Sequence, residues 1–206
     1  IAFSAIGRLL VSIAEATRCR YPGLELGRQR GLDASGAVGR AVRLAPRVGA
    51  ALRAFTLYMH LHDRGAIPYL WTAASQAMFG YTLYCSDVDG SDQIHDGAIA
   101  IACNMMRELA GHGWQATEIR LFRDRPEDVK PFRDHFRAPI RFGAREAAMI
   151  FPASDLHRPC VDADPKRYAQ SLSDLESLDV AAETSFADKV RRVLLRLLVT
   201  GACVEG

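Results

Sequence analysis

Residues 92–110 carry the pattern that most restricts how this chain can fold. Apolar side chains recur there at spacings of three and four residues, which places them on one face of a helix; they are Ile94, Ala98, Ile101, Ala102, Met105 and Leu109. Ser91 or Asp92 can cap the start of the helix, and Gly111 comes just after its end. A helix with one long apolar face has to cover another layer, so we expect it to pack across a sheet.

Further segments have the pattern of β-strands, and they predict that sheet. They are residues 66–73, 76–88, 114–122, 139–144 and 146–152. The first two lie on either side of the turn-like sequence "ASQ" and predict an antiparallel pair. Residues 126–136 predict a short helix that could have Pro126 in its first turn.

Helical patterns also stand at both ends of the chain. Residues 1–21 predict a helix that ends before Pro22, and a short loose segment is expected to lead to an amphipathic helix at 48–61. Residues 165–198 predict a helical tail that bends around "SLDVAAET". The predicted class is α+β: a mostly antiparallel sheet covered by a long helix, with an N-terminal helical pair and C-terminal helices. We divide the chain into a sensory domain at 1–164 and a helical connector at 165–206.

Composition limits where and how such a chain works. Its 206 residues, 49% of them hydrophobic, suffice for one globular core plus an appendage. No run approaches the ~20 apolar residues that cross a bilayer, and the first residues lack a basic leader and a cleavage site, so we expect a cytoplasmic protein without membrane contact. The five cysteines form no CxxC pair, which argues against a disulfide framework and a structural zinc site.

Arginine is concentrated near the amino end. Residues 1–64 hold ten arginines, no lysine and four acidic residues. In "GLDASGAVGRAVRLAPR" (31–47), Arg40, Arg43 and Arg47 stand among small residues, and Asp33 is the one acid. A guanidinium fork can bind a phosphate, or the O6 and N7 atoms of guanine, through two bonds. The segment therefore predicts an anionic partner that the chain itself does not supply.

Two longer stretches resemble a known family. They are "GSDQIHDGAIAIACNMMRELAG" and "EIRLFRDRPEDVKPFRDHFRAPIRFGAREAAMIFPASDLHRPCVDADP". Both are similar to the ligand-binding (arabinose-binding-like) domain that precedes the DNA-binding module in one branch of AraC-type transcription regulators. The resemblance runs from about residue 24 to the end of the chain.

The resemblance implies a function. A member of this family is expected to bind a small-molecule effector, to form a homodimer, and to control DNA binding by a C-terminal module. The ending "FADKVRRVLLRLLVTGACVEG" resembles the connector that leads into two helix-turn-helix units, and these units are absent from the sequence given. Effector binding would shift the population of a conformation in which the C-terminal module binds DNA or a partner subunit.

The first-choice effector is cyclic di-GMP. In this segment relatives usually have an aromatic or apolar residue in place of Arg40 and a small polar one in place of Arg47, and Asp33 and Ser35 are also unusual there. "DASGAVG" and the RxxxR pair in "RLAPR" partly resemble the signature of PilZ-type cyclic di-GMP receptors, although the first element is one residue too long and the order is reversed. No cofactor or metal is expected. The predicted ligand-binding residues are Arg28, Arg30, Asp33, Ser35, Arg40, Arg43 and Arg47.

Two other interpretations of the same regulator remain open. In one, the effector is an apolar or carboxylate-bearing metabolite held between sheet and helix, with one arginine as counter-ion. Its pocket would be lined by Trp71, Phe79, Tyr81, Tyr84 and Met105, which are equally suited to be ordinary core residues. In the other, residues 28–47 contact a second subunit or operator phosphates.

Catalysis is not expected. "HLHDRG" brings together His60, His62 and Asp63, but histidines two residues apart in a helix point to different sides and cannot chelate one ion. "DVDGSD" lacks the order of acids and glycine that an EF-hand requires. The sequence has no G-x-S-x-G, HExxH, P-loop or dinucleotide-binding fingerprint.

Overall fold

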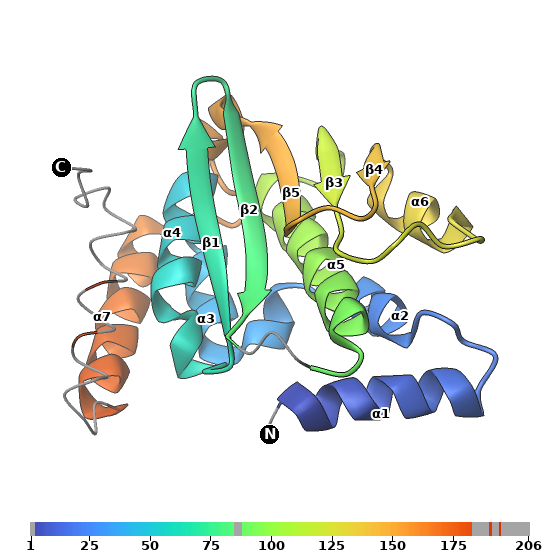
Figure 1. Ribbon diagram of the computed structural model, residues 1–206. Coiled ribbons are helices and arrows are strands. Elements are labelled where there is room, and N and C mark those ends of the chain that lie inside the picture. Colours follow the sequence, from blue (N-terminus) through green and yellow to red (C-terminus); the bar gives the residue numbers. More distant parts are fainter. Residues whose placement is uncertain (1–2, 85–87, 183–189, 191–193, 195–206) are drawn as a thin grey trace, which may run out of the picture.

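The computed structural model describes residues 3–84, 88–182, 190 and 194. Its centre is a sheet of five strands in the order β1-β2-β5-β3-β4 (Figure 1). Neighbouring strands run antiparallel except β3 and β4, which are parallel. The strands are β1 (Ala66–Ala73), β2 (Gln76–Leu83), β3 (Glu118–Arg120), β4 (Ile140–Arg141) and β5 (Ala147–Pro152). The α+β class with a mostly antiparallel sheet is confirmed.

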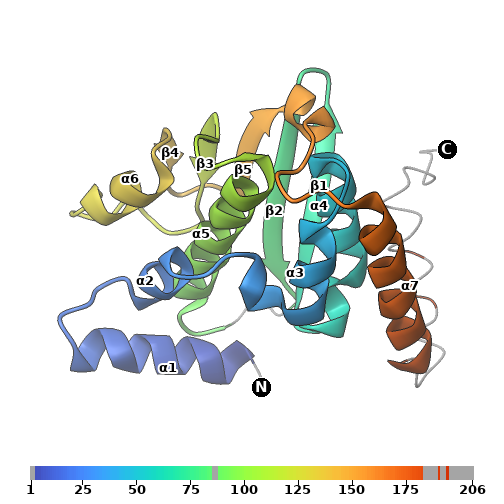
Figure 2. The same ribbon diagram turned by 180° about the vertical axis from the view of Figure 1, so that it is seen from behind.

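The long helix occupies the predicted place. Helix α5 spans Ser91–Ala110 and packs against β2 and β5. Helix α4 (Val48–Tyr58) continues into a 3-10 turn, η2 (Met59–Leu61), and packs on β1. Seen from behind the sheet, α3, α4 and α5 all lie on the same side of it (Figure 2). The core between these layers contains fully buried Leu52, Ile99, Met106 and Phe151.

The segment predicted to be loose is helical. It forms α2 (Pro22–Arg28), the 3-10 turn η1 (Leu32–Ser35) and α3 (Gly36–Arg43). A Cβ placed on Gly39 would lie 1.8 Å from the carbonyl oxygen of Leu32, so only glycine lets η1 and α3 approach this closely. Glycine lowers helix propensity, and packing between the elements outweighs that cost here.

Several other predicted boundaries were wrong; among them, β2 ends at Leu83 and β4 covers only Ile140–Arg141. Helix α6 is Lys130–Phe136, so Pro126 lies outside it and Pro131 stands in its first turn. The carboxylate of Asp128 accepts a hydrogen bond of 2.9 Å from the backbone N–H of Lys130 at this start. The third strand covers only Glu118–Arg120 of the predicted 114–122.

Helices at the two ends frame the domain. Helix α1 (Phe3–Ala16) contacts α2 and α5, as expected of an N-terminal amphipathic helix. Helix α7 (Pro165–Ala182) continues without a break past the start of the predicted bend, and its Leu175 is buried in the core. The rest of the predicted C-terminal helix lies outside the described residues, apart from residues 190 and 194. The 3-10 turn η3 (Ala153–His157) follows β5. Within the described residues, no helix is both long and apolar enough to cross a lipid bilayer.

Candidate functional site

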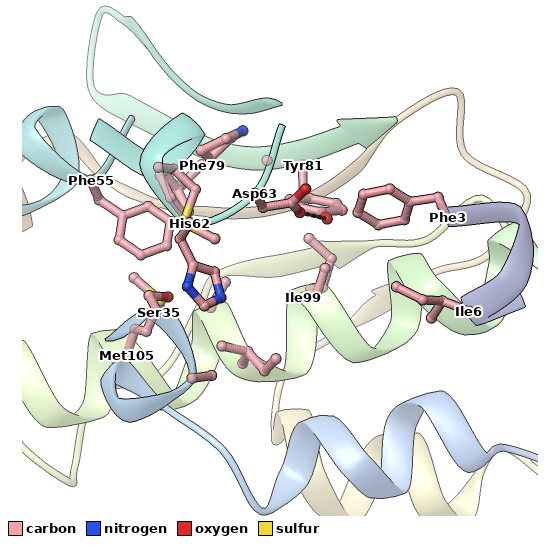
Figure 3. A pocket seen from close by; sticks show the side chains of 17 residues that line it. Phe3, Ile6, Ser35, Phe55, His62, Asp63, Phe79, Tyr81, Ile99 and Met105 are labelled. Carbon is pink, nitrogen blue, oxygen red and sulfur yellow. Dashed lines mark hydrogen bonds between the residues drawn. The ribbon is translucent and has the colours of Figure 1, made fainter. Parts of the chain in front are cut away.

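A cavity of about 420 Å³ lies between the sheet and helix α5 (Figure 3). Its volume falls in the ~300–1,000 Å³ range of small-molecule sites. Helix α5 contributes the face predicted from the sequence, with Ala98, Ile101, Ala102 and Met105. The two alanines reach less far toward the sheet than larger residues would, and this leaves the space open. Strand β2 supplies the opposite wall with Phe79 and Tyr81.

Residues of several other elements close the sides of the cavity. Helix α1 brings Phe3 and Ile6 to one end (Figure 3). The end of α4 and the following turn bring Phe55 and Met59. Turn η1 contributes Ser35, which is buried. The lining is therefore mainly apolar and comes from segments far apart in the sequence.

The polar groups of the cavity follow turn η2. The carboxylate of Asp63 accepts a hydrogen bond of 3.1 Å from the hydroxyl of Tyr81 and one of 2.9 Å from the backbone N–H of Gly65 (Figure 3). The ring of His62 lies beside Gly36: a Cβ placed on Gly36 would be 3.5 Å from Nδ1 of His62. In the sequence, the residues of "HLHDRG" form only a weak metal-binding pattern, which does not indicate their place in this cavity.

The structure places the predicted ligand-binding residues in several parts of the domain. Arg28 pairs with Glu25 at 2.8 Å, and Arg30 pairs with Asp33 at 3.1 Å. The backbone N–H of Gly31 and the side chain of Arg30 together hold the pKa of Asp33 below its usual range. These pairs lie within one short segment of the chain, where the sequence had suggested arginines without acidic partners.

Arg43 also finds acids within the chain. It pairs with Glu108 of α5 and lies 3.6 Å from Asp162. A second oxygen of Glu108 accepts a hydrogen bond of 3.0 Å from the backbone N–H of Leu32. The premise that the chain supplies no acidic partner was therefore wrong for Arg43, whose partners are distant in the sequence. Among the described residues, Arg40 and Arg47 form no such ion pair.

Arg40 and Arg43 nevertheless face a second, more open cavity of about 600 Å³. Arg167 of α7 and the acids Asp162 and Asp164 also line it. Of the other predicted ligand-binding residues, Ser35 lines the cavity under the sheet instead. Arg47 lies at the N-terminal end of α4, where its backbone bridges to Pro159.

The pocket between sheet and helix, which the sequence offered as an alternative effector site, agrees with the structure at three of its five predicted lining residues. Phe79, Tyr81 and Met105 line the cavity under the sheet as that interpretation expected. Trp71 does not line it, because its side chain lies on the other face of β1 and is 55% exposed. Tyr84 is also exposed. The expected arginine counter-ion is absent from the described residues that line this cavity.

Arg123 forms a largely buried ion-pair cluster with two acids of α5. Arg123 lies 2.6 Å from Asp96 and 2.7 Å from Asp92, with its guanidinium over the rings of Tyr21 and Phe132. Burial raises the pKa of Asp96, and Arg123 limits that rise. Within the described residues, no group of three or more metal-ligating side chains is found. An apolar cavity with few polar groups suits binding of a small molecule.

Comparison with known proteins gives consistent results. Residues 1–160 match the model of the family described as the arabinose-binding domain of AraC transcription regulators, N-terminal. The HTH-type transcriptional regulator VirS of two Mycobacterium tuberculosis strains is 27% identical over 198 residues, which are 95% of this chain and 58% of VirS. The chain thus spans little more than half the length of these relatives.

A solved structure has the same fold. The crystal structure of the transcriptional regulator CdpR from Pseudomonas aeruginosa superposes with a TM-score of 0.70 at 19% identity. The match covers 97% of this chain and 65% of the CdpR chain. At this identity the likeness concerns the fold alone.

Proposed function

Because this chain belongs to the family of N-terminal ligand-binding domains of AraC transcription regulators, we propose that it senses a small, mainly apolar effector in the cavity between β2 and α5. The observation that carries the proposal is this cavity of about 420 Å³, whose walls come from α1, η1, α4, β2 and α5. A ligand there touches both the sheet and the helices that cover it. Its binding can therefore favour one arrangement of those layers over another.

The effect of the ligand would reach a DNA-binding module through α7. This helix starts the proposed connector at Pro165 and packs against α3 and η2. Turn η2 leads directly into the polar groups of the cavity, His62 and Asp63. DNA binding by a further C-terminal module and assembly into a homodimer belong to the same proposal.

The cavity can be tested with a neutral fluorescent probe, N-phenyl-1-naphthylamine. We expect the wild-type protein to bind one molecule with enhanced fluorescence. Ala102→Leu fills the cavity from α5 and should abolish that signal, because Ala102 lines the wall and is only 6% exposed. Ala37→Leu, on the exposed face of α3, is the matched control and should bind as wild type does. Equal binding by both variants would place the probe elsewhere and contradict the proposal.

Cyclic di-GMP at the arginine surface is the second candidate. It is favoured by the cavity that Arg40, Arg43 and Arg167 share, and it is opposed by Asp162 and Asp164 in the same walls. Calorimetry with cyclic di-GMP on the wild type and on the Arg40→Ala/Arg43→Ala variant tests it. Heat in the wild type that the variant lacks, with probe binding under the sheet unchanged, would support this candidate. No heat in the wild type would remove it.

A further inference from the structure

The polar end of the cavity under the sheet is built around Asp63. This carboxylate follows η2 and points toward Tyr81 of β2 (Figure 3). One oxygen accepts from the backbone N–H of Gly65 at 2.9 Å, and the other accepts from the Tyr81 hydroxyl at 3.1 Å. An ionised carboxylate has about four acceptor sites, so each oxygen can accept a further hydrogen bond.

Tyr81 makes this end of the cavity a pure acceptor. Burial raises the pKa of Tyr81, and the neighbouring charge of Asp63 raises it further, so the phenol keeps its proton. That proton is donated to Asp63, and the phenol oxygen has only lone pairs left to offer. A ligand group that reaches Asp63 and Tyr81 must therefore be a hydrogen-bond donor.

Asp63 forms no ion pair with a cationic side chain of the described residues, and this includes His62 in the same cavity wall. No arginine or lysine is among the described residues that line it, and none forms an ion pair with Asp63 in the described part of the chain. A carboxylate ligand would place two like charges together in a mainly apolar space, at a high cost in desolvation and repulsion. A cationic group would supply the missing counter-charge.

We propose that the effector is an apolar molecule bearing a protonated amine or a similar cationic donor, which pairs with Asp63 while its apolar body lies between Phe79, Ile99 and Met105. This inference rests on the proposed use of the cavity as the effector site. It replaces the carboxylate-bearing metabolite that the sequence had allowed. Asp63 is then the residue that selects the charge of the effector, and α5 and β2 select its shape.

Three probes with one apolar body and different head groups separate the possibilities: 4-phenylbutylamine, 4-phenylbutan-1-ol and 4-phenylbutanoate. Their binding is measured by calorimetry at pH 7.5 and by displacement of N-phenyl-1-naphthylamine. A charge-assisted hydrogen bond favours the amine, so we expect it to bind about tenfold more tightly than the acid. Asp63→Asn should weaken amine binding by about tenfold and leave binding of the alcohol within about twofold.

Two controls keep this test decisive. Asp63→Asn retains an oxygen to accept from Gly65, and its melting temperature shows whether the fold persists. Tyr81→Phe removes the hydrogen bond to Asp63 but keeps the carboxylate, so amine binding should be retained or tightened.

The failures of the two proposals are distinguishable. Equal or better binding of the acid, an amine affinity that Asp63→Asn does not change, or displacement by none of the three probes overturns the amine inference. Absence of naphthylamine binding in the wild type overturns the proposed effector site itself.

Discussion

The imidazole of His60 joins the cavity wall to helix α7, because its Nε2 lies 2.7 Å from Oδ1 of Asp179. Its Nδ1 lies 2.9 Å from the carbonyl oxygen of Leu57. Both ring nitrogens thus face acceptor oxygens, and the ring donates to both when it carries two protons. His60 stands in η2 between Met59 and His62, which line the cavity. A ligand that shifts this turn would pull directly on α7.

Asp179→Ala tests this connection. Asp179 is 3% exposed, and its loss removes the acceptor that lies 2.7 Å from Nε2 of His60, while the contact of Nδ1 with Leu57 remains. We expect a loss of about 1 to 3 kcal/mol in the free energy of unfolding. Amide hydrogen exchange should become faster in 165–182, with little change in the sheet. Asp174→Ala, on the exposed side of the same helix, should change neither; equal effects of the two variants would contradict the connection.

Glu108→Ala is expected to destabilise the domain more than Arg40→Ala does. Glu108 binds the backbone N–H of Leu32 and pairs with Arg43, so it fastens η1 and α3 to α5. The side chain of Arg43 is 39% exposed, and water weakens that pair. We therefore expect Glu108→Ala to lower the free energy of unfolding by about 1 to 2 kcal/mol, mainly because the backbone N–H of Leu32 loses its acceptor.

The matched control is Arg40→Ala, whose side chain is exposed on α3. Its free energy of unfolding should stay within about 0.5 kcal/mol of that of the wild type. Urea unfolding of the three proteins measures the difference. Equal stability of Glu108→Ala and Arg40→Ala would mean that Glu108 does not hold η1 and α3 on α5.

The crossing of α2 and α5 depends on glycine. A Cβ placed on Gly27 would lie 2.4 Å from the carbonyl oxygen of Gly97, and one on Gly23 would lie 1.9 Å from that of Gln93. Gly27→Ala should therefore force the helices apart and lower the free energy of unfolding by about 1 to 3 kcal/mol. Gly113→Ala, where a Cβ meets nothing within 4 Å, should cost less than about 0.5 kcal/mol. Thermal unfolding compares them, and similar melting temperatures would show that the crossing tolerates a methyl group.

Much of the fold was predictable because its signals are local. The apolar face of α5 and the aromatic strands of the β1–β2 hairpin can each be identified within about twenty residues of sequence. The helices of residues 22–43 were not predicted, since their stability comes from contacts such as Gly39 against Leu32 and Gly27 against Gly97. Such contacts form between backbone atoms, and the glycines that allow them are their only trace in the sequence.

The site was harder to predict for the same reason. The acidic partner of Arg43 is Glu108, which lies 65 residues away in the sequence. Charges close to Arg43 in the sequence therefore suggested an unpaired arginine, although the fold brings Glu108 to it. Conversely, Asp63 and Tyr81 are 18 residues apart, and nothing in either segment shows that they meet. Phe79, Tyr81 and Met105 were predictable pocket residues because they share faces with the core. The pattern could not show which of these faces would be left unfilled.

The stability of the domain should fall in mild acid because of His135. This side chain is 8% exposed, and burial together with the charge of Arg107 lowers its pKa to about 4 from 6.5. The unfolded chain therefore takes up a proton between pH 6.5 and 4 while the folded domain does not. The stabilising contribution is complete above pH 6.5 and is lost as the pH falls toward 4.

Urea unfolding at two pH values tests this role of His135. Between pH 7 and pH 5 we expect the free energy of unfolding of the wild type to fall by about 1 to 2 kcal/mol more than that of His135→Leu. His112→Leu, which removes an exposed histidine, should keep the wild-type slope. Parallel slopes for the wild type and His135→Leu would show that His135 takes up its proton equally in both states.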